Sequence, residues 1–238
     1  MPNRKRRTTP ADDRDRTLLH ELQAPLTHLR VLIEKARAAS WCGSECQAAL
    51  EPCLEQLRLA GQMISDLLLL EKQDAGKLVA ERRAVDLGDL VSRTARAYGP
   101  VAESKGISLS FGDLRAPTVH GNDQQIRRIL ANLLDNAVRH TSSGGTIRIQ
   151  LLEGESWAEI QVIDSGCGIS PEHLPRIFDR FYQVDKTTDG ETGGVGLGLA
   201  IARALADQNE AKLSAESTLG KGSKFTLRLP RAARNRTS

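Results

Sequence analysis

The sequence predicts an α+β protein with a helical hairpin that forms a dimeric four-helix bundle, followed by an α/β sandwich. Three observations predict this. Apolar residues follow a heptad from residue 15 to 73, strand-like alternation and helical patterns replace it after about residue 77, and glycine clusters separate the later segments. Of the 238 residues, 39% are hydrophobic and 26% charged, a balance typical of globular proteins.

The heptad predicts two helices joined by a turn at residues 40–45. The apolar positions of the first helix are Leu19, Leu22, Leu26, Leu29, Ile33 and Ala36. Those of the second are Cys46, Leu50, Cys53, Leu57, Ala60, Ile64 and Leu67. One hairpin cannot cover its own apolar seam, whereas two hairpins docked as a four-helix bundle can. We therefore expect an obligate homodimer.

The chain has four cysteines, too few for a disulfide scaffold in a protein of this length. Cys46 and Cys53 lie on seam positions, where a free cysteine behaves as a small hydrophobic residue. The alternative is a thiol or metal sensor built from Cys42, Cys46 and Cys53.

After residue 77, alternation predicts strands over 146–152, 157–164 and 223–229. Helical patterns cover 86–104, 123–140 and 196–207, with Asp86 and Asp123 as expected N-caps. Strands mixed with helices indicate a sheet with one covered face. The boundary between the two parts is expected at 73–77.

A formal charge of +3 is too weak to indicate a nucleic-acid partner. The basic clusters at 3–7 and 231–236 are interpreted as solvated ends. No apolar run approaches the roughly 20 residues of a membrane helix, so we expect a soluble, cytoplasmic chain. The basic start is also what the cytoplasmic flank of a membrane anchor further upstream would look like.

Three glycine clusters punctuate the second part, at 164–170, 193–201 and 220–223. The first follows directly on a predicted strand. The second leads into a predicted helix, where free backbone amides and the helix dipole favour an anion such as phosphate. The third is interpreted as a hairpin turn and no more.

A helix ahead of these loops carries polar residues on one face. Asn132 and Asn136 are four residues apart, and their amide oxygens suit a magnesium ion that bridges phosphates. Arg139 follows on the same side and can contact phosphate. The alternative is an ordinary surface helix with two solvated asparagines.

Five motifs together resemble the cytoplasmic catalytic core of a two-component sensor histidine kinase, over residues 14–230. They occur in the family's order: HELQAP (20–25) like the phosphoacceptor box, NLLDNAVRHT (132–141) like the N box, DSGCGI (164–169) like the first glycine box, IFDRFY (177–182) like the F box and GGVGLGLAI (193–201) like the second glycine box. The resemblance implies a dimerisation and phosphotransfer domain (14–76) followed by a Bergerat-fold ATP-binding domain (77–230). A basic flank (1–13) and a tail (231–238) lie outside it.

The resemblance also implies roles for individual residues. Asp164 would take the adenine amino group, Asn136 would hold Mg²⁺ with Asn132 beside it, Arg139 would meet phosphate, and the His140 ring would lie against the base. The nucleotide site would comprise Asn132, Asn136, Arg139, His140, Asp164, Gly166, Gly168, Gly194, Gly196, Leu197 and Gly198. Residues 168–194 would form a mobile lid over ATP, anchored by packing of Phe178 and Phe181.

By the same resemblance, His20 would accept the γ-phosphoryl group of ATP and pass it to an aspartate in a response regulator receiver domain. A neutral imidazole is a nucleophile at neutral pH, and Glu21 would accept a hydrogen bond from the other ring nitrogen. Pro25 should bend the helix just past His20, because it cannot donate to the Glu21 carbonyl. His28 also lies in the bundle but has no acidic neighbour.

Three positions depart from the family pattern. Ala24 stands where many relatives have a threonine or asparagine that helps water attack the phosphorylated regulator. Gln183 stands where a basic residue reaches ATP phosphate, unless Arg180 replaces it. Residues 209–211 read NEA where His-Gly-Gly is common, a segment interpreted as peripheral.

Two other functions remain open. ATPases of the gyrase and chaperone type share the ATP-binding fold but begin the N box with a glutamate that activates water, whereas this chain has Asn132 there. A pseudokinase or dimeric scaffold would bind nucleotide without transfer. Asn136 and Asp164 argue against it.

Overall fold

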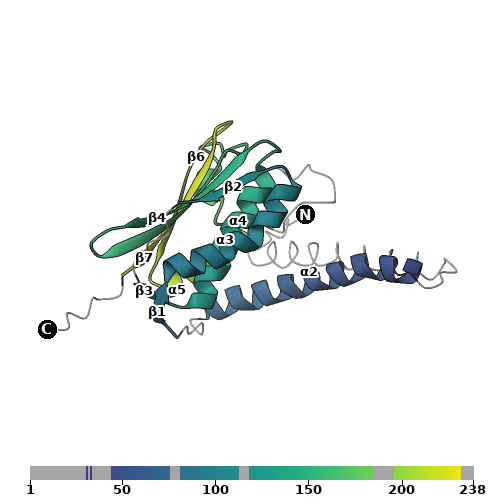
Figure 1. Cartoon of the computed structure of the whole chain (residues 1–238). Helices are drawn as coiled ribbons and strands as arrows, with labels where there is room; N and C mark the ends of the chain where they lie inside the picture. Colours follow the sequence, from purple (N-terminus) through teal and green to yellow (C-terminus); the bar gives the residue numbers. More distant parts are fainter. Residues whose placement is uncertain are drawn as a thin grey trace, which may run out of the picture. The chain divides into compact units, whose positions relative to one another are not determined.

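A computed structural model describes residues 31, 33, 44–75, 81–112, 118–184 and 196–231 (Figure 1). The chain divides into two compact units, Met1–Glu71 and Lys72–Ser238. His20, Glu21, Ala24, Pro25 and His28 lie outside the described residues. No helix in the part of the chain that the structure describes is both long and apolar enough to cross a membrane.

The first unit contains most of helix α2 (Ser44–Asp74), which corresponds to the second predicted helix. Its predicted seam divides into two sets. Cys53 and Ala60 are buried, at 5% and 8% exposure, whereas Leu57 and Ile64 are about half exposed, at 51% and 49%. The heptad thus marks two apolar stripes, and a single chain covers only one of them.

The second unit is built on a five-stranded sheet in the order β2-β4-β5-β7-β6. Its strands are β2 (Ser108–Phe111), β4 (Thr146–Glu153), β5 (Trp157–Asp164), β7 (Gly222–Pro230) and β6 (Lys212–Thr218). β2 pairs parallel with β4, and the other pairs are antiparallel. A two-stranded ribbon, β1 (Arg83–Asp86) with β3 (Thr118–Gly121), forms a separate sheet, and an isolated antiparallel bridge between Val119 and Arg231 joins it to the end of β7.

Helices α3 (Leu87–Ser104), α4 (Asp123–His140) and α5 (Gly198–Gln208) lie on one face of the sheet (Figure 1). A short 3₁₀ helix, η1 (Leu174–Arg176), precedes α5. The core forms where strand alternation meets the apolar helix faces. Its fully buried strand residues include Ile147, Ile149, Ile160, Val162, Phe225 and Leu227. The expected sheet with one covered face is confirmed.

The ends of the helices test the predicted caps. Asp86 caps α3, because its side chain accepts a hydrogen bond from the Asp89 amide. The prediction for Asp123 is wrong by one residue: Asn122 caps α4 by accepting from the Gln125 amide at 3.0 Å, and Asp123 is the first helical residue. Both side chains can cap a helix, so the sequence alone did not separate them.

Candidate functional site

Asp164 is the last residue of β5 and the centre of the site. Strand pairing places it opposite Ser223 of β7, and it is only 5% exposed. Its Oδ1 accepts two backbone hydrogen bonds, from Gly166 at 2.9 Å and from Ser223 at 3.2 Å. Burial raises the pKa of this carboxyl, while the two hydrogen bonds and the nearby His140 oppose that rise. The result is a buried acceptor held in a fixed orientation.

The loop after Asp164 passes so close to other backbone that its glycines have no room for a side chain. A Cβ on Gly166 would collide with the His140 carbonyl, and one on Gly168 with the Thr218 carbonyl. Gly168 also has φ +69°, which L side chains rarely adopt. The first glycine cluster therefore lets the loop lie directly against α4 and the β6–β7 turn.

Helix α4 brings Asn132 and Asn136 to one side of the unit, because Leu133, Leu134 and Ala137 are buried on the other. Both asparagines are partly buried, and Arg139 is exposed. The Asn132 side chain faces the start of α5, since its amide group lies 3.9 Å from where a Cβ of Gly198 would be. The structure therefore brings Asn132 and Gly198 together.

Two buried side-chain atoms among the described residues have no hydrogen-bond partner: Asn132 Nδ2 and Thr141 Oγ1. Buried polar groups are normally paired, because leaving one unpaired costs roughly 1–3 kcal/mol. Asn132 is the first residue of the N box and Thr141 is its last. Unpaired groups at both ends of this motif are what a site for a polar ligand leaves unsatisfied.

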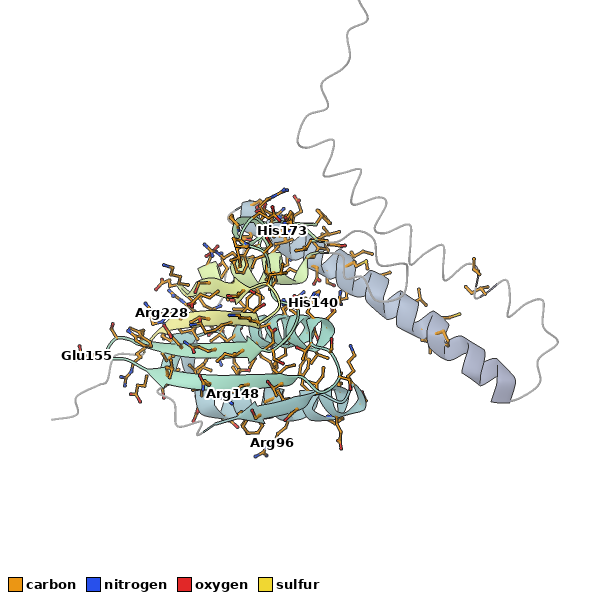
Figure 2. All side chains as sticks on the ribbon, turned by 90° about the horizontal axis from the view of Figure 1, so that it is seen from above. Arg96, His140, Arg148, Glu155, His173 and Arg228 are labelled. Atoms are coloured by element: carbon orange, nitrogen blue, oxygen red, sulfur yellow. The ribbon has the colours of Figure 1, made fainter. Side chains whose placement is uncertain are left out.

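His140 is the last residue of α4 (Figure 2), and Asp164 is close enough to interact with it electrostatically. Its pKa is lowered, first by desolvation and then by the positive charge of Arg139, while Asp164 acts in the opposite direction. The ring is therefore neutral at pH 7, although the side chain keeps access to solvent. A neutral ring can pack against an uncharged planar group.

The second glycine cluster lies only partly in the described chain, because Gly194 falls outside it. Gly196 has φ +71°, and its carbonyl accepts from the Phe181 amide at 3.0 Å. Leu197 is buried, and Gly198 begins α5, whose N-terminus has no side-chain cap. Uncapped amides at a helix start can bind an anion.

The predicted lid, residues 168–194, is described only up to residue 184, and the chain that follows it is described again from residue 196. Phe178 lies under the guanidinium of Arg203, 5.7 Å from the ring centroid. Phe181 has φ +61°, and its amide donates a hydrogen bond to the Gly196 carbonyl. The Tyr182 hydroxyl forms a hydrogen bond of 2.7 Å with Nδ1 of His173. These contacts tie the start of the lid to α5 and to the η1 region.

The family comparison agrees with this geometry. Residues 121–233 match the family model described as histidine kinase-, DNA gyrase B-, and HSP90-like ATPase. Over 214 residues the chain is 39% identical to the sensor histidine kinase RppB of Synechocystis sp., covering 89% of this chain and 47% of that protein. It is 34% identical to the sensor histidine kinase CusS of Escherichia coli, covering 90% and 44%.

The chain belongs to the sensor histidine kinase family. The resemblance predicted from the five motifs is confirmed, as is an ATP-binding domain of this type. The chain spans about half the length of the curated relatives it matches.

Solved structures support the fold of this histidine kinase core. The histidine kinase AdeS of Acinetobacter baumannii superposes with a TM-score of 0.71 at 20% identity, covering 89% of this chain and 98% of that one. The histidine kinase ThkA, solved in complex with the response regulator protein TrrA, gives a TM-score of 0.68 at 20% identity, covering 94% and 63%.

Sequence reasoning missed the part of the kinase site that the third glycine cluster builds. The expectation that residues 220–223 are a turn and no more is wrong. A Cβ on Gly222 would collide with the Asp164 carbonyl, and the Ser223 amide holds the Asp164 carboxylate. The signal was available: if residues 223–229 pair antiparallel with 157–164, Ser223 lies opposite Asp164.

The expectation that residues 209–211 are peripheral is also wrong. Asn209 is fully buried, accepts from the Asn122 amide at 2.7 Å and donates to Gln125 Oε1 at 2.7 Å. It therefore joins the end of α5 to the start of α4. A single polar residue in a turn gives no sequence signal for such burial.

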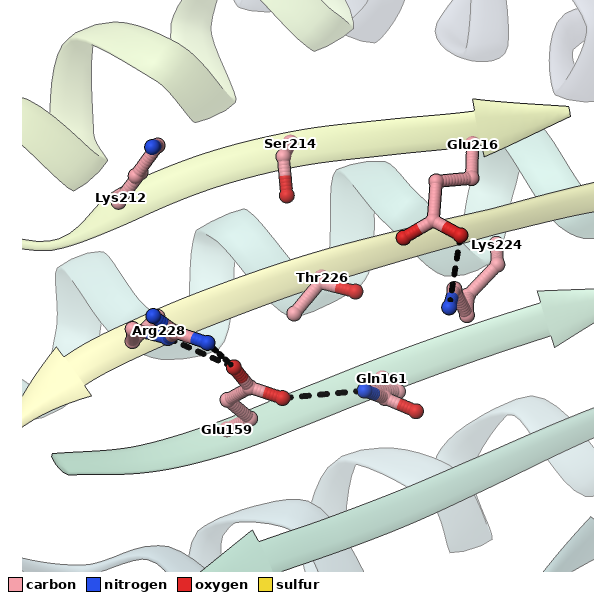
Figure 3. A pocket seen from close by; sticks show the side chains of 8 residues that line it. All are labelled: Glu159, Gln161, Lys212, Ser214, Glu216, Lys224, Thr226 and Arg228. Carbon is pink, nitrogen blue, oxygen red and sulfur yellow. Dashed lines mark hydrogen bonds and ion pairs between the residues drawn. The ribbon is translucent and has the colours of Figure 1, made fainter. Parts of the chain in front are cut away.

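A separate concavity lies on the face of the sheet opposite the helices (Figure 3). It encloses about 350 Å³ and is lined by Glu159, Gln161, Lys212, Ser214, Glu216, Lys224, Thr226 and Arg228. Arg228 pairs with Glu159, and Lys224 pairs with Glu216 at 2.9 Å. The charged side chains that line this concavity largely neutralise each other. We therefore interpret it as an ordinary polar surface of the sheet and prefer the surroundings of Asp164 as the candidate ligand site.

Proposed function

We propose that this chain is the ATP-dependent autokinase core of a two-component sensor. It phosphorylates itself on His20 and passes the phosphoryl group to an aspartate of a response regulator. The observation that carries the proposal is the buried Asp164 carboxylate, fixed by two backbone amides, together with the unpartnered amide of Asn132 on α4.

Asp164 supplies selection of the base. An ionised carboxylate only accepts hydrogen bonds, and the 6-amino group of adenine donates one. Guanine carries a carbonyl oxygen at that position, so it would oppose the carboxylate acceptor directly. The neutral His140 ring supplies a flat surface for the base.

The residues present fit a magnesium nucleotide. The Asn132 and Asn136 oxygens are the hard donors that Mg²⁺ prefers, and the unpaired Nδ2 of Asn132 is free to donate to a phosphate oxygen. When bound, Mg²⁺ neutralises charge on the transferred phosphoryl group. Arg139 and the uncapped start of α5 add positive potential for the phosphates.

His20 then performs the transfer. A neutral ring nitrogen attacks the γ-phosphorus, a P–N bond forms, the bond to the β–γ bridging oxygen breaks, and ADP leaves with that electron pair. Glu21 accepts a hydrogen bond from the other ring nitrogen and stabilises the ring as it gains positive charge. Asn132 cannot act as a base for water, which favours transfer to histidine over hydrolysis.

The core acts as a homodimer. On α2 the exposed apolar residues are Leu54, Leu57, Ile64 and Leu68, at 49–58% exposure, and Gly61 shares their stripe. Their spacing of three and four residues is that of a coiled-coil seam. A second copy would bury this stripe and complete a four-helix bundle. We place the dimer in the cytoplasm, beneath a membrane anchor in an upstream segment of the full-length protein.

The test is self-labelling with γ-labelled ATP and Mg²⁺, followed by acid treatment. We expect an acid-labile label, as for a phosphoramidate, and His20→Gln should abolish it while ADP affinity stays within about twofold, because nucleotide and acceptor lie in different domains. His28→Gln is the matched control and should still label. If only His28→Gln loses the label, the phosphoacceptor is His28 and not His20. ATP turnover without any protein label would instead favour an ATPase of the gyrase type.

A further inference from the structure

The hydroxyl of Ser217, on β6, joins three separate pieces of backbone and side chain. It accepts from the Ile169 amide at 2.7 Å, donates to the Gly222 carbonyl at 2.8 Å and lies 3.0 Å from the Ser223 hydroxyl. A serine hydroxyl has one donor and two acceptor positions. Because the Gly222 carbonyl can only accept, the Ser217 proton points there, and Ser223 must donate to Ser217. Every hydrogen-bonding position of Ser217 is therefore used.

These bonds connect the first glycine loop to the β6–β7 turn. Ile169 closes that loop, and Ser223 is the residue whose amide holds Asp164. A further bond runs from the Gly220 amide to the Cys167 carbonyl at 2.7 Å. The collisions that a Cβ on Gly168 or Gly222 would cause show how closely the two segments lie. The loop that carries the site is therefore positioned by the turn behind it.

We propose that Ser217 is a positioning residue for nucleotide selection: its hydroxyl fixes Ser223 and Ile169, and through them the Asp164 carboxylate, without touching the nucleotide. This inference rests on the proposed adenine role of Asp164. Removing the hydroxyl leaves three groups without their partner, namely the Ile169 amide, the Gly222 carbonyl and the Ser223 hydroxyl. The turn would then hold Asp164 less firmly in the orientation that accepts the adenine amino group.

The pH dependence of binding distinguishes this role from general destabilisation. The Ser223 amide is one of the groups that lower the pKa of Asp164 against the effect of burial. A looser Ser223 therefore raises that pKa, and ADP affinity should begin to fall at a higher pH on acidification. The other charges near Asp164 are His140 and Arg139 at the end of α4, and Glu216, Lys221 and Lys224 around the turn. None of them changes in the variant.

The experiment measures ADP and GDP affinity with Mg²⁺ in the 238-residue chain between pH 5 and pH 8. For Ser217→Ala we expect about three- to tenfold weaker ADP binding, roughly what the loss of one well-placed hydrogen bond gives, with a smaller adenine-to-guanine ratio. The acid limb of the profile should shift upward in pH. Ser217→Thr keeps the hydroxyl and should restore the ratio and the profile.

Two controls make the result decisive. Ser214→Ala removes an exposed hydroxyl from the same strand and should change nothing. Leu227→Val lowers stability from the buried side of β7 without touching the hydrogen bonds of Ser217. If Leu227→Val shifts the profile as much as Ser217→Ala does, or if Ser217→Ala binds ADP as the natural chain does, the proposal fails. If the natural chain shows no ADP binding at all, the proposed function fails with it.

Discussion

The two units of this chain leave different kinds of side chain without a partner, apolar in the first and polar in the second. Helix α2 leaves large apolar side chains half exposed along one stripe. The ATP-binding unit buries its core side chains completely, with Leu133, Leu134, Ile149 and Phe225 at 0% exposure, and its exposed apolar residues, such as Val101, Leu152 and Leu219, lie on different elements and form no such stripe. What the second unit leaves unsatisfied is polar: Asn132 Nδ2 and Thr141 Oγ1.

The difference indicates what each unit needs. An exposed apolar stripe is stabilised by another apolar surface, which a second copy of the same helix supplies. An unpaired buried amide is stabilised by a hydrogen-bonding ligand, which a nucleotide supplies. The kind of group left unsatisfied therefore predicts the kind of partner, a protein for the first unit and a small polar molecule for the second.

The largest expected effect comes from charging the apolar stripe. Leu57→Asp with Ile64→Asp should convert the proposed homodimer to monomers, because docking would bury four carboxylates in an apolar seam at several kcal/mol each. Sedimentation over a range of protein concentrations measures this. ADP affinity should stay unchanged, since the second unit keeps its own core.

Gln62→Glu is the matched control, since it adds a negative charge to the same helix at an exposed position off the stripe. It should leave the dimer intact. A charged double variant that remains dimeric would place the interface on a different surface.

The second effect concerns the polar side of the comparison. Asp164→Asn replaces an acceptor-only group by one that also donates, so ADP affinity should fall by roughly 10- to 100-fold, as expected for a hydrogen bond to a charged group. Adenine should lose most of its advantage over guanine. Isothermal titration with ADP and GDP measures both quantities.

Asp164→Asn should lower ADP affinity without lowering the stability of the fold. Burial raises the Asp164 pKa above its usual 3.8, so the folded chain binds this proton more tightly than the unfolded chain. Its contribution to stability therefore falls as pH rises from the usual pKa to the raised one, and the buried charge is a cost at pH 7. Asp164→Asn should not lower Tm at pH 7 and should remove this slope.

Glu159→Gln is the control for Asp164→Asn, because it neutralises another buried carboxylate of β5 that pairs with Arg228 on the open face of the sheet. It should leave ADP affinity unchanged. Equal losses of affinity in the two variants would mean that Asp164 acts through the sheet and not on the base.

The sequence predicted the elements whose patterns are long. Strands β4, β5 and β7 each run for eight or nine residues, and α3 and α4 each run for 18, so the buried face of each element repeats several times. Strands β1, β2 and β3 have four residues each, too few to show a period. The strand that carries Ser217 was missed for another reason: its exposed positions alternate with small residues such as Ala215, and the apolar signal is weak.

The site shows the same limit. Asn132 and Asn136 were predicted as site residues from their spacing on one helical face, and Asp164 from the resemblance of its glycine box to that of the family. Ser217, Ser223 and Asn209 act through contacts between segments that are far apart in the chain. Such contacts follow from strand pairing and helix packing, and the residues that make them are ordinary polar residues in the sequence.

The smallest effect on ADP affinity should come from Asn209→Ala. This variant removes a buried polar side chain that is hydrogen-bonded within the protein, in contrast to the unpaired Asn132 and Thr141 of the same unit. Asn209 pairs its side-chain oxygen and its side-chain nitrogen, accepting from the Asn122 amide and donating to Gln125 Oε1 and the Leu205 carbonyl. Alanine would leave the buried ends of these bonds unpaired, so the free energy of unfolding should fall by about 1–3 kcal/mol. ADP affinity should change less than twofold, because this network involves only protein groups.

Gln208→Ala is the control for Asn209→Ala, because Gln208 is the preceding residue and is partly exposed. It should leave both the free energy of unfolding and the ADP affinity nearly unchanged. Chemical unfolding and ADP titration of the two variants measure the contrast, and a loss of ADP affinity in Asn209→Ala beyond its loss of stability would show that the network extends into the site.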